Sequence, residues 1–193
     1  MYDVASSVLR RSFLAALLVG GFGLTSGCDG ETDEAGEVEL VAVAGDGETF
    51  IAIVADDETV AIYTCDGTEE GVNTFEWLVG DNDGGSFDIA SPDAAIVGTF
   101  ADDGSASGTL TVNAVDYSFT ATPASGDEGM YYADESDYYG GWVVVGDSVR
   151  GAVINRLQTG AIAVGVSFSP SVGSVVVDGI TLTPIKQTVL DYK

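Results

Sequence analysis

The 193-residue sequence contains no histidine, and cysteine and lysine each occur only twice. The absence of histidine excludes the Ser-His-Asp triad, the Cys-His pair and the usual zinc sites, all of which need an imidazole. Two cysteines are also too few for a zinc site built from cysteine alone.

Basic residues are scarce, and this scarcity sets the electrostatic character of the chain. Six Lys and Arg side chains stand against 31 Asp and Glu, which gives a formal net charge of −25, and the acids are spread along the sequence. A field of this sign repels nucleic acids and anionic lipid headgroups. We therefore expect neither class as a partner.

Long helical patterns are missing as well. From Val38 onward the sequence consists of about a dozen short runs rich in Val, Ile, Thr, Phe and Tyr, separated by Gly and Asp. Alternation is clearest at 117–122, YSFTAT, where Tyr117, Phe119 and Ala121 would share one face and the hydroxyl-bearing residues the other. A period of two is typical of a half-buried strand.

Two-residue turns connect several of these runs. Asn113-Ala114 is short enough for a hairpin, and Asp178-Gly179 is a strong hairpin signal because a type I′ turn needs positive φ at both positions. Many short strands on sequential hairpins predict an all-β fold, an antiparallel meander closed as an up-and-down barrel or barrel-like sheet, with a β-sandwich as the alternative. We expect residues 38–193 to form a single β-domain.

An apolar run at 13–24 precedes this region. The run is shorter than the roughly 20 residues that a membrane-spanning helix needs. Two arginines lie before it, and the small residues 25–27 lie between it and Cys28. A positive start, a short apolar centre and a small-residue exit are typical of a secretory signal. We predict that residues 1–27 are a signal helix, cleaved between Gly27 and Cys28.

Two short motifs in this segment resemble known export patterns. The stretch 25–28, TSGC, resembles a bacterial or archaeal lipobox, which implies that Cys28 carries a diacylglycerol and becomes the mature N-terminus; the usual leucine lies one place early, at Leu24. The stretch 10–14, RRSFL, resembles the twin-arginine motif R-R-x-F-L. The matching positions are Arg10, Arg11, Phe13 and Leu14. An ordinary secretion signal with two adjacent arginines is the alternative.

The identification of a prokaryotic lipoprotein sets further expectations. Lipid on Cys28 would anchor the protein to the outer face of the cytoplasmic membrane or cell envelope, with the acidic residues 28–37 as a tether. Removal of 1–27 leaves four basic against 30 acidic side chains, a formal net charge of −26. Cys65 would then lack a disulfide partner, and because no histidine can activate it, we predict a buried, inert thiol.

A series of short motifs runs through the mature chain. It comprises Tyr63-x-Cys65-Asp66-Gly67, Phe75-x-Trp77, Phe119-x-Ala121-x-Pro123-Ala124, Gly129-x-Tyr131, Gly141-Trp142 and Arg150-Gly151. The series resembles a family of uncharacterised exported bacterial proteins, many of them from actinobacteria. The similarity covers residues 59–151 and ends there. It implies a β-domain and brings no activity, because none is assigned to that family.

Three carboxylates near a glycine-bearing loop suggest a metal site. Asp81, Asp83 and Asp88 offer the hard oxygen ligands that Ca²⁺ prefers. The spacing departs from the EF-hand, because Gly85 occupies its fifth position and no glutamate its twelfth. A calcium site is therefore a hypothesis beside the simpler interpretation of a solvated hairpin loop. We expect no other cofactor.

The stretch 129–142, GMYYADESDYYGGW, places four tyrosines and a tryptophan around an acidic centre. Exposed aromatic rings beside carboxylates could stack on a sugar or hold a cationic ligand. The candidate ligand-binding residues are Tyr132, Tyr138 and Trp142. The alternative is two strands, 130–133 and 138–145, joined by an acidic loop, with Tyr131, Tyr139 and Trp142 in the core.

These observations predict an exported, lipid-anchored β-domain that binds a ligand or has a structural role in the envelope. The alternative is an exported carboxylate-dependent hydrolase acting on carbohydrate, since two fixed carboxylates can cleave a glycosidic bond. With 30 acids in the mature chain, some pair will always lie at a suitable distance, so the presence of two carboxylates is no evidence for this hydrolase. We therefore expect a binding protein rather than an enzyme.

Overall fold

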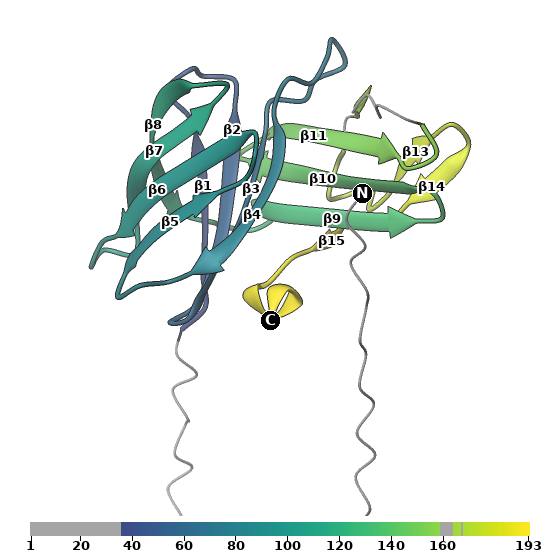
Figure 1. Cartoon of the computed structure of the whole chain (residues 1–193). Helices are drawn as coiled ribbons and strands as arrows, with labels where there is room; N and C mark the ends of the chain where they lie inside the picture. The colour runs from purple at the N-terminus through teal and green to yellow at the C-terminus, as the bar shows by residue number, and fades with distance from the viewer. Residues whose placement is uncertain (1–35, 159–163, 167) are drawn as a thin grey trace, which may run out of the picture. The chain divides into compact units, whose positions relative to one another are not determined.

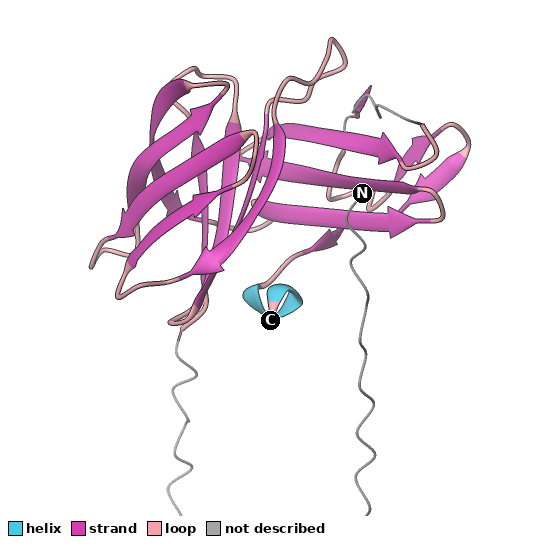
Figure 2. Ribbon diagram, viewed as in Figure 1, coloured by secondary structure: helices cyan, strands magenta, loops and turns pink. Residues whose placement is uncertain are grey.

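The computed structural model describes residues 36–158, 164–166 and 168–193 (Figure 1). The predicted signal peptide, its twin-arginine and lipobox residues, Cys28 and the tether up to residue 35 lie outside this part of the chain. Strands and turns make up nearly all of the described residues, with one short 3₁₀ helix, η1 (Val189–Tyr192), at the end (Figure 2). The prediction of an all-β fold is confirmed. None of the described helical residues form a segment long and apolar enough to cross a membrane.

The first eight strands form one antiparallel sheet. They are β1 (Val38–Val43), β2 (Phe50–Ala55), β3 (Thr59–Cys65), β4 (Phe75–Asp81), β5 (Ser86–Ala90), β6 (Ala94–Phe100), β7 (Ala106–Val112) and β8 (Val115–Pro123). Their order in the sheet is β4-β3-β2-β1-β8-β7-β6-β5. Each strand pairs with a neighbour in sequence, and β1 pairs with β8, so the sheet curls into a nearly closed up-and-down barrel. This confirms the predicted meander, with a seam between β4 and β5.

The barrel interior follows from alternation along the strands. Phe119 and Ala121 of β8 are buried, whereas Ser118 and Thr120 between them are exposed, as the sequence predicts. The interior cluster contains Leu40, Ala42, Ala44, Ile51, Ile53, Ala55, Val60, Ile62, Leu78, Phe87, Ile89, Ala94, Ile96, Ala106, Leu110, Val112, Phe119 and Ala121. The set combines small and large side chains, and these fill the interior of the narrow barrel.

A second sheet follows the barrel in sequence. Its strands are β9 (Gly129–Glu135), β10 (Tyr138–Val145), β11 (Ser148–Asn155), β12 (Val164–Gly165) and β15 (Ile185–Lys186), in the order β12-β11-β10-β9-β15. A separate hairpin consists of β13 (Val175–Val177) and β14 (Ile180–Leu182). Its turn residues Asp178 and Gly179 have φ values of 50° and 81°. The hairpin predicted from Asp178-Gly179 is confirmed, as is the one at Asn113-Ala114 between β7 and β8.

The second sheet packs against the outer face of the β1–β4 wall, and the two belong to one compact unit, Asp33–Lys193. The interface cluster consists of Val41, Phe50, Ala52, Val54, Ala61, Tyr63, Cys65, Met130, Val143, Ala152 and Val189. Every residue of β2 is consequently buried, because alternate side chains enter the barrel and the interface. This explains the unbroken apolar run FIAIVA, which is typical of a strand covered on both faces.

The other face of the second sheet has its own core. Trp142 lies at its centre with no exposed surface, and the β13–β14 hairpin covers it through Val175 and Leu182. Figure 1 shows this hairpin beside the ends of β10 and β11, away from the barrel. The two faces of β9 and β10 therefore have different partners, the barrel wall on one side and the hairpin on the other.

Candidate functional site

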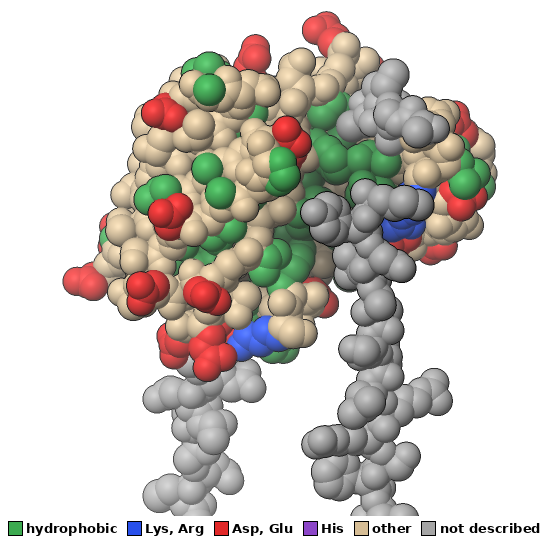
Figure 3. Space-filling view, viewed as in Figure 1, with side chains coloured by type: hydrophobic (Ala, Val, Ile, Leu, Met, Phe, Trp, Pro, Cys, Tyr) green, Lys and Arg blue, Asp and Glu red, His purple; other side chains and the backbone are tan. Residues whose placement is uncertain are grey.

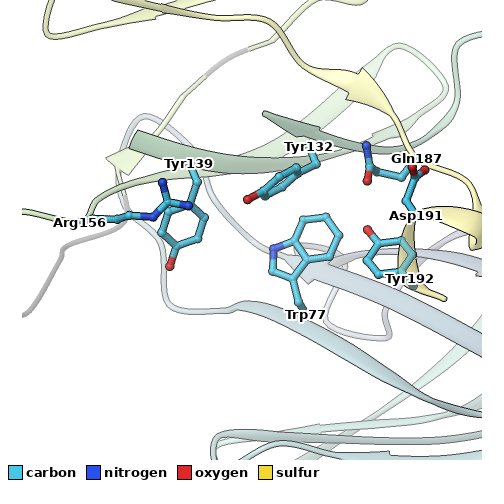
Figure 4. Close-up of a pocket in the computed structure, with 7 residues that line it drawn as sticks. All are labelled: Trp77, Tyr132, Tyr139, Arg156, Gln187, Asp191 and Tyr192. Carbon is cyan, nitrogen blue, oxygen red and sulfur yellow. The ribbon is translucent and has the colours of Figure 1, made fainter. Parts of the chain in front are cut away.

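An aromatic cleft of about 510 Å³ lies where β4 meets the barrel-facing side of the second sheet. Its lining residues are Trp77, Tyr132, Tyr139, Arg156, Gln187, Asp191 and Tyr192 (Figure 4). They come from β4, β9, β10, the end of β11 and the C-terminal segment that includes η1. Figure 3 shows apolar side chains gathered along this junction, while acidic side chains are scattered over the rest of the visible surface.

Trp77 is held in the cleft by Tyr63 and Gly141. In β4 the alternation sends Leu78 into the barrel and Trp77 outward, opposite Tyr63 of β3. The two rings are stacked with centroids 4.2 Å apart, and the Tyr63 hydroxyl donates to the Gly141 carbonyl at 3.0 Å. A Cβ on Gly141 would lie 2.6 Å from Tyr63 Cζ and 2.7 Å from Trp77 Cζ2. A residue without a side chain is therefore required where the second sheet meets these rings.

Tyr132 and Tyr139 project into the cleft from the β9–β10 hairpin. Tyr132 pairs with Gly141 and Tyr139 with Asp134, so the two tyrosines lie on the same face of the sheet. The Tyr132 ring is perpendicular to the Trp77 ring, with centroids 5.6 Å apart, an arrangement that aromatic pairs favour. The second sheet thus supplies two aromatic rings to the cleft and the barrel wall supplies one.

Arg156 closes one end of the cleft. Its guanidinium lies 4.6 Å from the Tyr139 ring centroid. Nη1 donates to Asp134 Oδ1 at 2.7 Å and Nη2 to Oδ2 at 2.6 Å, so both carboxylate oxygens are used. Hydrogen bonds from Arg156 lower the pKa of Asp134. Burial, followed by the hydrogen bond to Asp134, raises the pKa of Tyr132 to about 12, so this tyrosine is a neutral donor at physiological pH.

The C-terminal segment forms the opposite end. Asp191 Oδ2 accepts hydrogen bonds from the Thr188 backbone N–H at 2.8 Å and from its hydroxyl at 3.1 Å, which caps η1. The Tyr192 hydroxyl donates to Met130 Sδ at 3.3 Å, and its ring lies 6.1 Å from that of Trp77. The capping hydrogen bonds and the sulfur contact hold Asp191 and Tyr192 in place, so hydrogen bonds fix the side chains at both ends of the cleft.

One polar atom in the cleft has no partner. Trp77 Nε1 is buried and makes no hydrogen bond within the described part of the chain. Figure 4 shows the indole nitrogen on the edge of the ring that faces Tyr139, with the Tyr132 hydroxyl pointing toward the same space. A buried donor left unsatisfied costs about 1–3 kcal/mol, and such groups in folded proteins call for a specific explanation.

The structure does not bring together the three aromatic residues proposed from the sequence. Tyr132 lines the cleft. Trp142 is instead fully buried on the other face of the sheet, where its Nε1 donates to the Val166 carbonyl at 2.9 Å. Tyr138 donates to Asp178 Oδ2 at 3.0 Å, also away from the cleft. Strand alternation explains the difference, because Trp142 pairs with Tyr131, whose side chain points to the face opposite that of Tyr132.

The alternative assignment of core residues needs a similar correction. Tyr131 and Trp142 are buried, as that interpretation predicted, but Tyr139 is only half-buried and lines the cleft. Arg156, Trp77 and Tyr192 were not among the sequence candidates. The Phe75-x-Trp77 alternation was a usable signal for an outward-facing tryptophan. Its partners in the cleft depend on the packing of the second sheet, which sequence spacing does not show.

The carboxylates proposed for calcium lie elsewhere. Asp81, Asp83 and Asp88 line a groove beside the seam between β4 and β5. Across the described residues, no three His, Cys, Asp or Glu side chains are arranged to hold a metal ion together. The calcium site stays a prediction without geometric support.

Catalytic groups are few in and near the cleft. Of the described residues that line it, Asp191 is the one carboxylate, and the nearby Asp134 is bound through both oxygens to Arg156. Cys65 lies at the interface with no exposed surface, and its thiol is free within the described residues. The predicted burial of Cys65 is confirmed, and burial raises the pKa of its thiol to about 11; its lack of reactivity stays a prediction.

A scan against protein-family models found no match, and searches of the curated proteins and of the solved structures found none either. The resemblance carried by the motifs between residues 59 and 151 therefore stays a prediction.

Proposed function

We propose that this protein is an exported, lipid-anchored binding module and that the aromatic cleft is its ligand-binding site. The observation that supports this most directly is the convergence of Tyr132, Tyr139 and Tyr192 on Trp77, whose buried indole N–H has no partner within the described residues. These rings come from segments far apart in the chain, and the cleft volume of about 510 Å³ is typical of small-molecule sites. A mostly apolar cleft with a few fixed polar groups is suited to holding a ligand, and Asp191 is the one carboxylate among its described lining residues.

The binding part of the proposal can be tested with a matched pair of variants. Tyr132→Ala removes a ring from the cleft, whereas Tyr138→Ala removes a ring from the opposite face of the same hairpin. The full chain is screened by thermal denaturation against glucose, N-acetylglucosamine, maltose, choline, indole and phosphate. A ligand that binds the folded state raises the melting temperature. We expect such a rise with at least one probe, kept in Tyr138→Ala and lost in Tyr132→Ala; a panel with no effect, or equal loss in both variants, contradicts the proposal.

The anchoring part is tested separately by expressing the full chain in a bacterium. We expect the protein in the membrane fraction, and the variant Cys28→Ala released from it because the lipid can no longer be attached. Replacing Arg10 and Arg11 with lysine then examines the route: retention of the precursor in the cytoplasm indicates twin-arginine export, and unchanged export indicates an ordinary secretion signal. Membrane association that survives Cys28→Ala contradicts lipid anchoring without affecting the cleft.

A further inference from the structure

The charge distribution of the cleft disfavours an anionic ligand. Among the described lining residues Arg156 is the one cation, and its two terminal nitrogens are already bound to both oxygens of Asp134 at 2.7 and 2.6 Å. The chain as a whole carries a formal charge of −25. A phosphate or carboxylate would therefore have to displace Asp134 and approach against the field of the protein.

A cationic ligand fits poorly for a different reason. Aromatic cages bind ammonium groups through free ring faces that converge on one point. Here the guanidinium of Arg156 lies over the Tyr139 ring, and Tyr63 is stacked on one face of Trp77. Asp191, the one carboxylate among the described lining residues, already accepts two hydrogen bonds from Thr188. A second cation in the cleft would meet the positive charge of Arg156, which already lies over the Tyr139 ring.

An uncharged ligand with both apolar and hydroxyl surfaces suits the remaining groups. Trp77 Nε1 needs an acceptor, and the Gln187 amide, whose Nε2 donates to the Ile185 carbonyl at 2.9 Å, still presents its own carbonyl. The aromatic side chains between these groups offer apolar surface. A pyranose ring presents C–H faces to aromatic rings and carries hydroxyls that both donate and accept hydrogen bonds at its rim.

We infer that the aromatic cleft binds an uncharged sugar ring, and that the side chains around Trp77 shift on binding so that its Nε1, buried in this structure, donates a hydrogen bond to a sugar oxygen. The inference rests on the proposed function and names its ligand class. In this arrangement Trp77 determines specificity, because a ligand without an acceptor at that position leaves the buried N–H unsatisfied. Arg156 and Asp134 form a neutral end wall that limits the length of the bound sugar.

The test uses the full chain and direct titration calorimetry with glucose, N-acetylglucosamine and maltose, followed by an array of uncharged mono- to tetrasaccharides. Choline, indole and phosphate serve as probes of the other ligand classes. Trp77→Phe keeps an aromatic ring and removes the N–H, and Trp142→Phe makes the same change outside the cleft. We expect saturable binding of at least one saccharide, about tenfold weaker in Trp77→Phe and within twofold of the original in Trp142→Phe.

The other possible results overturn either the sugar inference alone or both proposals. Binding of choline, indole or phosphate, lost in Tyr132→Ala and without any saccharide binding, overturns the sugar inference and leaves the cleft as a ligand site. Saccharide binding that is equally strong in Trp77→Phe overturns the role of the indole N–H. Should Trp77→Phe fail to fold, Gln187→Ala gives an independent measurement, because loss of its carbonyl should weaken saccharide binding and leave indole binding unchanged. Failure of all six probes and the array overturns both proposals.

Discussion

The two walls of the barrel share a backbone arrangement but differ in what covers them. In the β1–β4 wall, every residue of β2 and all but the first residue of β3 are buried, because the second sheet covers the outer face. In the β5–β8 wall, strands such as β6 alternate between buried interior positions and accessible outward ones. The β5–β8 wall is therefore a sheet with one buried face. The β1–β4 wall lies between the barrel interior and the second sheet, so most of its residues are buried on both faces.

The different covering of the two walls explains why the aromatic cleft lies beside β4. An outward-facing aromatic residue in the β5–β8 wall would be exposed to solvent, whereas Trp77 in the β1–β4 wall meets a second layer of aromatic residues. The second sheet covers the wall incompletely at β4, and the uncovered margin is the aromatic cleft. The cleft is thus a consequence of the layer boundary, built from residues that also hold the two sheets together.

The largest expected effect comes from placing a charge on the outer face of each wall. Val54 of β2 has no exposed surface, and Val97 of β6 is 50% exposed. Val54→Asp would bury an unpaired carboxylate at a cost above about 4 kcal/mol, a large share of the roughly 5–15 kcal/mol that stabilises a typical domain. Val97→Asp should cost about 1 kcal/mol or less. Urea unfolding followed by circular dichroism measures both, and equal effects would contradict the two-wall description.

A smaller effect is expected at the contact between the layers. Gly141→Ala places a methyl group within 2.6 Å of the Tyr63 ring and 2.7 Å of the Trp77 ring, so the stack must shift. Overpacking of this kind costs about 1–3 kcal/mol. We expect a lower unfolding midpoint together with a changed tryptophan emission spectrum. A variant as stable as the original, with unchanged emission, would show that the second sheet does not press on the β4 edge.

Ionisation of the Asp134 and Glu76 carboxyl groups should change the stability of the folded state in opposite directions. Arg156 lowers the pKa of Asp134, so the stability that the pair provides is complete above the usual carboxyl range and is lost as the pH falls through the lowered value. Burial raises the pKa of Glu76 on β4, so its ionisation disfavours the folded state as the pH rises. At pH 7, Asp134→Asn should destabilise the protein by at most about 1 kcal/mol, because the pair is partly exposed.

Glu76→Gln should instead be slightly stabilising at pH 7, since the amide removes the charge of a partly buried side chain and can still contact Ser91. Both differences should shrink in acid, where the carboxyl groups are protonated. Unfolding midpoints at pH 7 and in acid measure the two trends. The same sign for both variants at pH 7 would contradict the environments described for these residues.

The smallest effect concerns the thiol inside the covered wall. Cys65 is fully buried and its pKa is raised to about 11, so little thiolate is present at pH 8. In the variant Cys28→Ala, where Cys65 is the one remaining thiol, reaction with a disulfide reagent should be about a hundredfold slower in the native state than in denaturant. Fast native labelling would mean that the β3 strand is accessible between the layers.

Much of the fold could be predicted from local signals. The alternation of Tyr117, Phe119 and Ala121 and the turn at Asp178-Gly179 are set by neighbouring residues, and the structure has both as expected. The up-and-down order follows because each hairpin places a strand beside its neighbour in sequence. These features depend on short-range chemistry that one sequence contains.

The site could be predicted only in part, because it depends on which faces meet. Tyr132 is among the predicted ligand-binding residues and lines the cleft, whereas Trp142, which the sequence leaves open between a ligand surface and the core, fills the core beneath the β13–β14 hairpin. Alternation shows that two residues of a strand share a face, and it does not show which layer that face will contact. Trp77, Arg156 and Tyr192 are brought together by packing between segments far apart in the chain, so no local pattern marks them as neighbours.

The central claim is that the uncovered margin of the β1–β4 wall binds a ligand at Trp77, and nuclear magnetic resonance tests it directly. The chain has two tryptophans, and the ¹H–¹⁵N spectrum should therefore show two indole N–H signals. Trp142 Nε1 is bound to the Val166 carbonyl, while Trp77 Nε1 has no partner within the described residues. On titration with the uncharged saccharides, the Trp77 signal should shift while that of Trp142 stays in place. A shift of the Trp142 signal alone, or of neither signal, would contradict the account.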